Sequence, residues 1–164
     1  MKCMRGMALA IVAGGVAMGT FGGGVSARDE IELFNKRYIE MHLKMDTEAI
    51  LATWAEDGVD LMPGEAPMIG KKAIVAWVEK IVSQMQGYKV VTEEVEFHDI
   101  HISGDWASEW ATEHQVVQPP GKEKLIESRG KMALVLHREA NGEWKVKQEM
   151  WNAAPKGIGA RGQS

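Results

Sequence analysis

The chain has very little cysteine and no concentration of basic residues. Of its 164 residues only Cys3 is a cysteine, and it lies at the start of the chain. Beyond that position the sequence offers no disulfide, no cysteine nucleophile and no cysteine-ligated metal. Lysine and arginine are scattered among acidic residues, at a formal net charge of −4. The sequence therefore has no basic patch for a nucleic-acid partner or an anionic membrane surface.

The sequence also lacks the usual metal-binding histidine patterns, HxH and HExxH. His98 and His101 are three residues apart in a segment expected to be extended, which predicts side chains on opposite faces. Two ligands on one strand should instead be two residues apart. We therefore expect neither a metal site nor a bound cofactor.

Residues 1–27 differ in kind from the rest of the chain. Two cations, Lys2 and Arg5, precede an apolar, glycine-rich run that ends in small residues. This is the anatomy of a signal peptide, and the run is short for a membrane span of about 20 apolar residues. We expect cleavage after Ala27, a periplasmic or secreted location and no membrane association afterwards. An uncleaved anchor is the alternative.

The remaining length fits a single domain. Removing 27 of the 164 residues leaves 137, and domains most often have about 100 to 150 residues. We expect one domain from 28 to 155. The glycine-rich segment 156–164 has no periodicity and is predicted to be a loose tail.

The first half of this domain has helical periodicity. Asp46 is a candidate cap for a short second helix, with Ile50 and Trp54 on one side. A third helix is predicted from Lys71 to Met85. The first helix is indicated by apolar residues at steps of three and four: Ile31, Phe34, Tyr38, Met41 and Met45.

The second half alternates instead. After Tyr88, turn-forming residues at 103–105, 119–121 and 141–142 divide the chain into about four strands joined as hairpins. Helices followed by an antiparallel meander predict an α+β fold with the helices on one sheet face. The segment Leu125–His137 is apolar on both faces, so we expect a homodimer packed through the sheet, the alternative being an exposed, lightly apolar face.

Three stretches together resemble a known family. They are RYIEMHLKMDTEAILATWAEDGVDLMPG, MIGKKAIVAWVEKI and RGKMALVLHREANGEWKVKQEMWNAAP. Their order and spacing are similar to those of the NTF2-like superfamily, in its SnoaL-like or DUF4440 branch, from about Asp29 to Pro155. The resemblance implies a cone in which a strongly curved antiparallel sheet wraps three helices. It also implies a deep pocket at the open end and a homodimer.

Tyr38 is the residue at which the resemblance is most specific. Its surroundings are similar to the first helix of ketosteroid isomerases, where the matching tyrosine stabilises an enolate oxygen. The companion acids of those enzymes would fall near Met62 and within 132–134, where this chain has no acid. Asp60 shares a strand face with Met62 but lies about 6 to 7 Å along it. We therefore prefer Tyr38 as a pocket-wall residue over known isomerase chemistry.

His114 is a second candidate for the pocket. It shares strand parity with Trp110, while Glu109 and Glu113 have the opposite parity. Either His114 or the glutamates should face the cavity, unless a bulge intervenes. A surface or structural histidine is the preferred interpretation.

Tryptophan and methionine are abundant, with six tryptophans in the chain, and both suit the wall of a ligand pocket. The main hypothesis is an exported pocket protein that binds a small, largely apolar molecule. One alternative is an isomerase, cyclase or dehydratase that uses Tyr38 with His114 or Asp60, and another is a homo-oligomeric association module. The sequence leaves open whether the protein is an enzyme. The expected ligand-binding residues are Tyr38, Trp54, Met62, Trp77, Trp110, Met132 and Trp151, with Asn152 at the rim.

Overall fold

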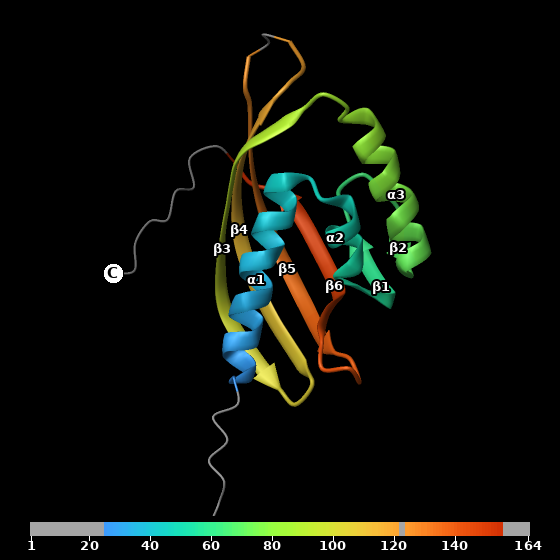
Figure 1. Cartoon of the computed structure of the whole chain (residues 1–164), viewed down its shortest axis with the longest axis vertical. Coiled ribbons are helices and arrows are strands. Elements are labelled where there is room, and N and C mark those ends of the chain that lie inside the picture. The colour runs from blue at the N-terminus through green and yellow to red at the C-terminus, as the bar shows by residue number, and fades with distance from the viewer. Residues whose placement is uncertain (1–24, 122–123, 156–164) are drawn as a thin grey trace, which may run out of the picture.

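The computed structural model describes residues 25–121 and 124–155. The predicted tail lies outside these residues, as does the predicted signal peptide apart from residues 25–27. Three helices lie on one face of a curved six-stranded sheet (Figure 1). The elements are α1 (Ala27–Lys44), α2 (Thr47–Ala52), β1 (Trp54–Leu61), β2 (Met68–Ile69), α3 (Lys71–Gln84), β3 (Lys89–Ser103), β4 (Trp106–Gln118), β5 (Ile126–Arg138) and β6 (Trp144–Ala153).

The sheet has the strand order β2-β1-β6-β5-β4-β3. Strands β3 to β6 form the expected antiparallel meander, with turns at the three predicted places. The α+β fold class is thereby confirmed. The sheet is mixed, however, because the last strand β6 returns beside β1 and runs parallel to it. The expectation of an entirely antiparallel sheet was therefore wrong for the pairing of β6 with β1.

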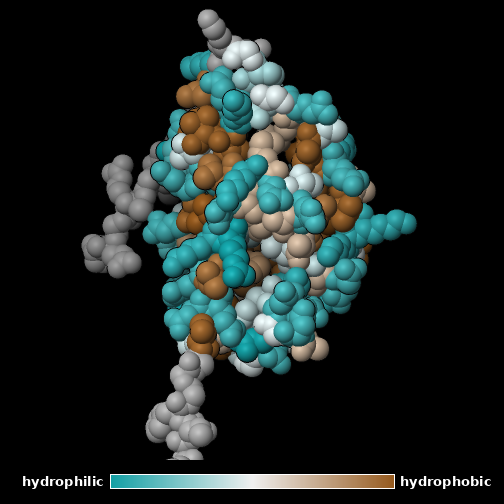
Figure 2. Space-filling model, in the orientation of Figure 1, coloured by the Kyte–Doolittle hydropathy of each residue, from teal (hydrophilic) through white to brown (hydrophobic). Residues whose placement is uncertain are grey.

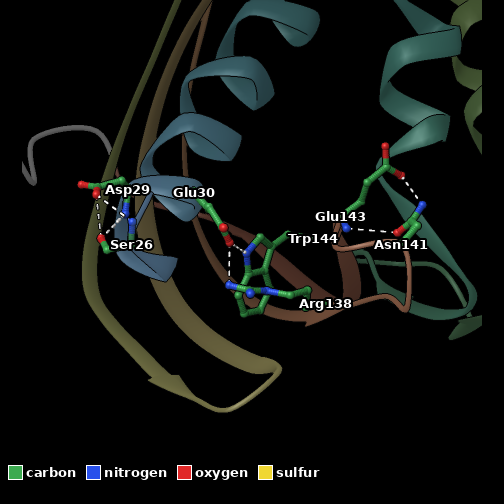
Figure 3. Close-up of polar contacts among 7 residues, drawn as sticks. All are labelled: Ser26, Asp29, Glu30, Arg138, Asn141, Glu143 and Trp144. Carbon is green, nitrogen blue, oxygen red and sulfur yellow. Dashed lines mark hydrogen bonds and ion pairs between the residues drawn. The ribbon is translucent and has the colours of Figure 1, made fainter. Parts of the chain in front are cut away.

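The helix α1 begins at a capping box. The Ser26 hydroxyl accepts a hydrogen bond from the backbone of Asp29, and the Asp29 carboxylate accepts one from the Ser26 backbone (Figure 3). Ser26 lies inside the segment predicted for removal, and cleavage after Ala27 stays a prediction. The buried face of α1 carries Ile31, Phe34, Asn35, Tyr38 and Met41.

Two details at the helix ends differ from the expectation. Met45 does not continue the buried face of α1, because it ends the helix in a left-handed conformation with φ 53°. The second helix stops at Ala52, and Trp54 begins β1 instead of sharing a helix side with Ile50. The third helix is as predicted to within one residue.

A polar contact fixes the start of α1 against the sheet. Glu30 accepts hydrogen bonds from Arg138 on β5, at 2.5 Å, and from the indole of Trp144 on β6, at 2.9 Å (Figure 3). The Arg138 guanidinium also lies over the Trp144 ring, 4.8 Å from its centroid. This end of the fold is therefore tied by side chains from three elements.

The outer face of the sheet keeps several large apolar side chains exposed: Trp106, Trp110 and Met150 are 46%, 42% and 47% exposed. Figure 2 shows the opposite, helix-bearing side, where hydrophilic residues predominate and hydrophobic ones form separate patches. A homodimer through the outer face stays a prediction, which light scattering of the purified protein would test. Among the described residues, no helix has the length and apolar character to cross a membrane.

Candidate functional site

A cavity of about 470 Å³ lies between α1, α3 and the concave face of the sheet. Its apolar wall consists of Met62, Pro63, Trp77, Ile81, Met132 and Trp151. Its polar wall consists of Tyr38, His42, Glu93, Glu113, Gln115, Ser128 and Glu149. The cavity therefore combines large apolar surfaces with a small set of titratable groups, as ligand sites commonly do.

The central polar contact of the cavity joins Tyr38 to Glu149. The Tyr38 hydroxyl lies 3.3 Å from each carboxylate oxygen of Glu149. Both side chains are buried, with 5% of each exposed. The periodicity of α1 directs Tyr38 inward, and β6 supplies Glu149 from the sheet. The hydroxyl donates this hydrogen bond, so the pair is a phenol facing a carboxyl group in an apolar setting.

Asp60 lies directly beside this pair. It is the register partner of Glu149 on the neighbouring parallel strand β1, and only 2% of it is exposed. Its Oδ1 atom has no hydrogen-bond partner among the residues that the structure describes. A buried carboxyl oxygen without a partner is costly, and such groups are often kept for function.

A β-bulge explains why Glu149 points inward. On β6 the pairing with β5 skips one residue, since Leu136 pairs with Val146 and Val135 pairs with Gln148. Lys147 is therefore an extra residue, and it reverses the inward-outward parity of the strand after it. Simple alternation from the buried Trp144 and Val146 would have placed Glu149 on the outer face.

A second group of polar side chains lies on β3 and β4. Gln115 donates to Glu93 at 2.8 Å, and the Trp151 indole donates to Glu113 at 2.5 Å. The Trp151 indole passes over Gly130, where a Cβ atom would lie 2.7 Å from the Glu113 Oε2 atom. The absence of a side chain at Gly130 is therefore what allows this contact.

Burial shifts the protonation of these groups toward their neutral forms. It raises the pKa of Glu149 to about 8, with a further contribution from the charge of Asp60. Burial also raises the pKa of Glu93 to about 8, where the neighbouring Glu113 adds to the effect, and that of Asp60 to about 6. The pKa of Tyr38 is well above its usual range, because the hydroxyl is buried and close to Glu149.

His42 completes the polar wall next to Tyr38. Its Nδ1 atom lies 2.7 Å from the backbone oxygen of Tyr38, so Nδ1 carries the proton and donates. Its ring centroid is 4.2 Å from that of Tyr38. Burial lowers the pKa of His42, which favours the neutral imidazole with its Nε2 atom free to accept a proton.

Five of the residues expected at the pocket border this one cavity, and three do not. Trp54 is buried in the main core, and Asn152 is exposed and does not border the cavity. Trp110 lies on the outer face, where it stacks on His98 at 4.1 Å and donates to Asp99 at 2.7 Å. The five that border the cavity are Tyr38, Met62, Trp77, Met132 and Trp151.

His114 and Asp60, the candidate partners of Tyr38, are placed differently. His114 lies on the outer face, with its two ring nitrogens each 3.0 Å from a carboxylate, those of Glu94 and Glu127. The inward positions of β4 belong to Ala107, Glu109, Ala111, Glu113, Gln115 and Val117. Of the two parities left open by the sequence, the one with the glutamates faces inward, so His114 cannot act with Tyr38 in this cavity.

A second buried polar pair does not border the cavity. Asn35 of α1 donates to Glu109 of β4 at 2.8 Å, and both side chains are 5% exposed. Burial raises the pKa of Glu109 to about 7. This pair links α1 to the sheet. Because Glu109 is a buried carboxyl group outside the cavity, it is a suitable control position for the carboxyl groups of the cavity.

The histidines of β3 correct one expectation about faces. His98 pairs with Trp110 and His101 pairs with Ser108, which places both on the same outer face. An extra residue between them in β3, next to Asp99 with its φ of 49°, cancels the parity difference. Within the described ranges, no three His, Cys, Asp or Glu side chains are grouped so that they could hold a metal ion.

Sequence reasoning missed Glu149, Glu93, Gln115 and His42 as site residues. The bulge in β6 concealed Glu149, because the extra Lys147 cannot be recognised by alternation. His42 could have been predicted as a site residue, because it lies four residues after Tyr38 and the helical spacing places both side chains on the same side of the helix. Glu113 was weighed only as an alternative to His114.

The fold and the sequence agree with one family. Residues 35–146 match the SnoaL-like domain family, and the chain belongs to this family of the NTF2-like superfamily. No curated protein matches the chain.

Solved structures show the same fold at low sequence identity. A ketosteroid isomerase-like protein from Erwinia carotovora atroseptica is 19% identical, with a TM-score of 0.65, over 77% of this chain and 95% of that one. A candidate dehydratase of the NTF2-like family from Streptomyces avermitilis is 16% identical, with a TM-score of 0.67, over 78% and 97%. A protein from Catenulispora acidiphila in complex with S-DNPA is 19% identical, with a TM-score of 0.61, over 77% and 92%.

Proposed function

We propose that the protein is an exported NTF2-like pocket protein that binds a small, largely apolar molecule. The observation that carries this proposal is the cavity of about 470 Å³ with an aromatic and thioether wall. Ligand cavities commonly have about 300 to 1,000 Å³, and few polar groups fix the orientation of the ligand in them. Here that role falls to Tyr38 and Glu149. The mass of the protein purified from its host's periplasm would test the exported location.

Two further observations support a binding role. A smaller apolar cavity of about 180 Å³ shares His42, Trp77, Ile81 and Gln115 with the first, so apolar space continues along α3. The structural neighbour from Catenulispora acidiphila is in complex with S-DNPA. An association module with a cavity filled by its own side chains fits this open volume less well.

Binding is testable with a neutral apolar fluorophore. N-phenyl-1-naphthylamine should bind saturably at one site per chain and accept excitation energy from Trp77 and Trp151. The variant Ser128→Trp places an indole at the exposed rim of the cavity and should weaken binding at least about tenfold by occupying the volume. The measurement is a fluorescence titration.

The matched control is Ser83→Trp, which adds the same side chain on an exposed position of α3. It should bind the fluorophore like the unmodified protein. Equal affinity of both variants would show that the cavity is not the binding site and would contradict the proposal.

A second candidate function is proton transfer, as in an isomerase, cyclase or dehydratase. It is favoured by Glu149, whose pKa of about 8 lies close to neutrality and whose carboxyl group lies 3.3 Å from the Tyr38 hydroxyl. A base with such a pKa accepts protons efficiently, and a buried phenol stabilises a developing oxyanion. In this candidate function Glu149, on β6, takes the place of the catalytic carboxylate that the resemblance to ketosteroid isomerases lacked.

If the protein catalyses proton transfer, it should exchange the α-protons of small aromatic ketones with deuterated water. The rate should rise with pH through about 8, because Glu149 must be ionised to act as base. Glu149→Gln and Tyr38→Phe should each lower the rate about 100-fold or more. Glu109→Gln, which changes a buried carboxyl outside the cavity, should not. Proton NMR follows the exchange, and an unchanged rate in Glu149→Gln would exclude this candidate.

A further inference from the structure

The cavity contains acidic groups without basic ones. Three glutamates border it, Glu93, Glu113 and Glu149, and Asp60 lies next to Glu149. Among the described residues that border the cavity there is no lysine or arginine. His42 is the only nitrogen base of the wall as described, and burial lowers its pKa, so it does not supply a positive charge.

None of the hydrogen-bond partners of these carboxyl groups is a cation, and Glu93 and Glu113 are also hydrogen-bonded to each other. Glu149 is met by the Tyr38 hydroxyl, Glu93 by the Gln115 amide and Glu113 by the Trp151 indole. Four acids are thus gathered in an apolar space. Burial raises the pKa of Glu149 and of Glu93, and the neighbouring carboxyl groups add to it, Asp60 and Glu113 for Glu149 and Glu113 for Glu93. This arrangement costs stability, and such costs are typical of functional sites.

Aromatic side chains border the same space. Trp77 from α3, Trp151 from β6 and Tyr38 from α1 all line the cavity. Aromatic rings attract cations through their negatively polarised faces, and tryptophan does so most strongly. A positive group in the cavity would therefore meet carboxyl groups and aromatic rings together, while a negative group would be repelled.

We infer that the ligand carries a protonated amine at one end and an apolar body, so that it neutralises Glu149 and its acidic neighbours while filling the aromatic cavity. This inference rests on the proposed binding function and specifies the class of ligand. The apolar body has room along α3, where the second cavity of about 180 Å³ adjoins the first. This ligand class applies both if the protein only binds its ligand and if it also transfers a proton.

Binding of a cation should change the protonation of the site. The titratable groups that line the cavity around such an amine are Tyr38 and His42 of α1, Glu93 of β3, Glu113 of β4 and Glu149 of β6. Asp60 of β1 lies next to Glu149. A positive charge nearby favours the ionised carboxylate and lowers its pKa. Binding at pH 7 should therefore release protons from Glu149 and Glu93, whose pKa values of about 8 leave them mostly protonated beforehand.

Three probes with the same phenylbutyl body, which differ only in the end group, test this inference: 4-phenylbutylamine, 4-phenylbutan-1-ol and 5-phenylpentanoate. The amine stays protonated below about pH 9, by analogy with lysine. Isothermal titration calorimetry at pH 7 should show the amine binding at least about tenfold more tightly than the alcohol, and the carboxylate more weakly than both. Titrations in buffers of different ionisation enthalpy should show proton release with the amine and none with the alcohol.

Glu149→Gln should reduce the ratio of amine to alcohol affinity about tenfold or more, with the alcohol affinity preserved as proof of an intact cavity. Glu93→Gln is the second variant, should Glu149→Gln not fold. Glu109→Gln removes a buried carboxyl outside the cavity and should leave the ratio unchanged. Equal affinities of amine and alcohol would overturn the inference and leave the binding function standing. If none of the three probes binds, the binding function fails with it.

Discussion

The protein is expected to lose stability as the pH rises from 5 to 9, with a melting temperature lower by about 10 °C at the alkaline end. The cause is the buried carboxyl groups of the cavity. Burial raises the pKa of Glu149 from 4.5 to about 8. Between these two values the folded protein holds a proton that the unfolded chain has released, so the free energy of unfolding falls as the pH rises. Thermal unfolding followed by circular dichroism across this range measures the effect.

The pH range over which stability is lost is set by the pKa values of the individual acidic groups. Asp60, with its pKa raised from 3.8 to about 6, contributes at the acidic end, and Glu149 and Glu93 contribute up to about pH 8. One pKa unit corresponds to about 1.4 kcal/mol, so the group of acids together accounts for several kcal/mol. Most acidic groups that gain a favourable partner on folding act in the opposite sense, because their pKa is lowered.

Glu149→Gln separates this effect from general charge repulsion. Glutamine keeps an oxygen that can accept from Tyr38 but cannot ionise, so the variant should be more stable than the unmodified protein at pH 9. Glu32→Gln removes a charge from the exposed face of α1 and should leave the slope nearly unchanged. Parallel pH profiles for the unmodified protein and Glu149→Gln would show that Glu149 does not carry the effect.

Much of the fold could be predicted from the sequence because its signals are local. Residues three and four apart fixed the buried face of α1, and the turns at 103–105, 119–121 and 141–142 fixed the hairpins. The pairing of β6 with β1 joins segments far apart in the chain, and no local pattern indicates it. The parallel end of the sheet was missed for this reason.

The site was harder to predict than the fold, because it depends on single extra residues. The bulge at Lys147 turns Glu149 inward, and an extra residue in β3 brings His98 and His101 to one face. Alternation alone assigns such residues to the wrong face. Trp110 shows a different cause of error, since both parities of β4 carry candidates and the inward one proved to be acidic instead of aromatic.

Gly130→Ala should destabilise the protein by about 1 to 3 kcal/mol and abolish most ligand binding. Gly130 lies on β5, inside the sheet, and is paired with Glu113 on β4 and Ala153 on β6. A Cβ atom there would lie 2.6 Å from the Trp151 ring atom Cε2 and 2.7 Å from Glu113 Oε2. Trp151 must then move away, its hydrogen bond to Glu113 breaks, and the cavity wall shifts. Thermal unfolding and the fluorophore titration measure the two effects.

A double-mutant cycle with Trp151→Ala tests whether the indole is the cause. Removing Trp151 removes the atoms that the new methyl group would strike, so Gly130→Ala should cost much less stability in the Trp151→Ala background. The difference between the two costs is the energy of the steric conflict. An equal loss of stability in both backgrounds would mean that the substitution acts through the backbone at position 130. The steric conflict with Trp151 would then not be the cause.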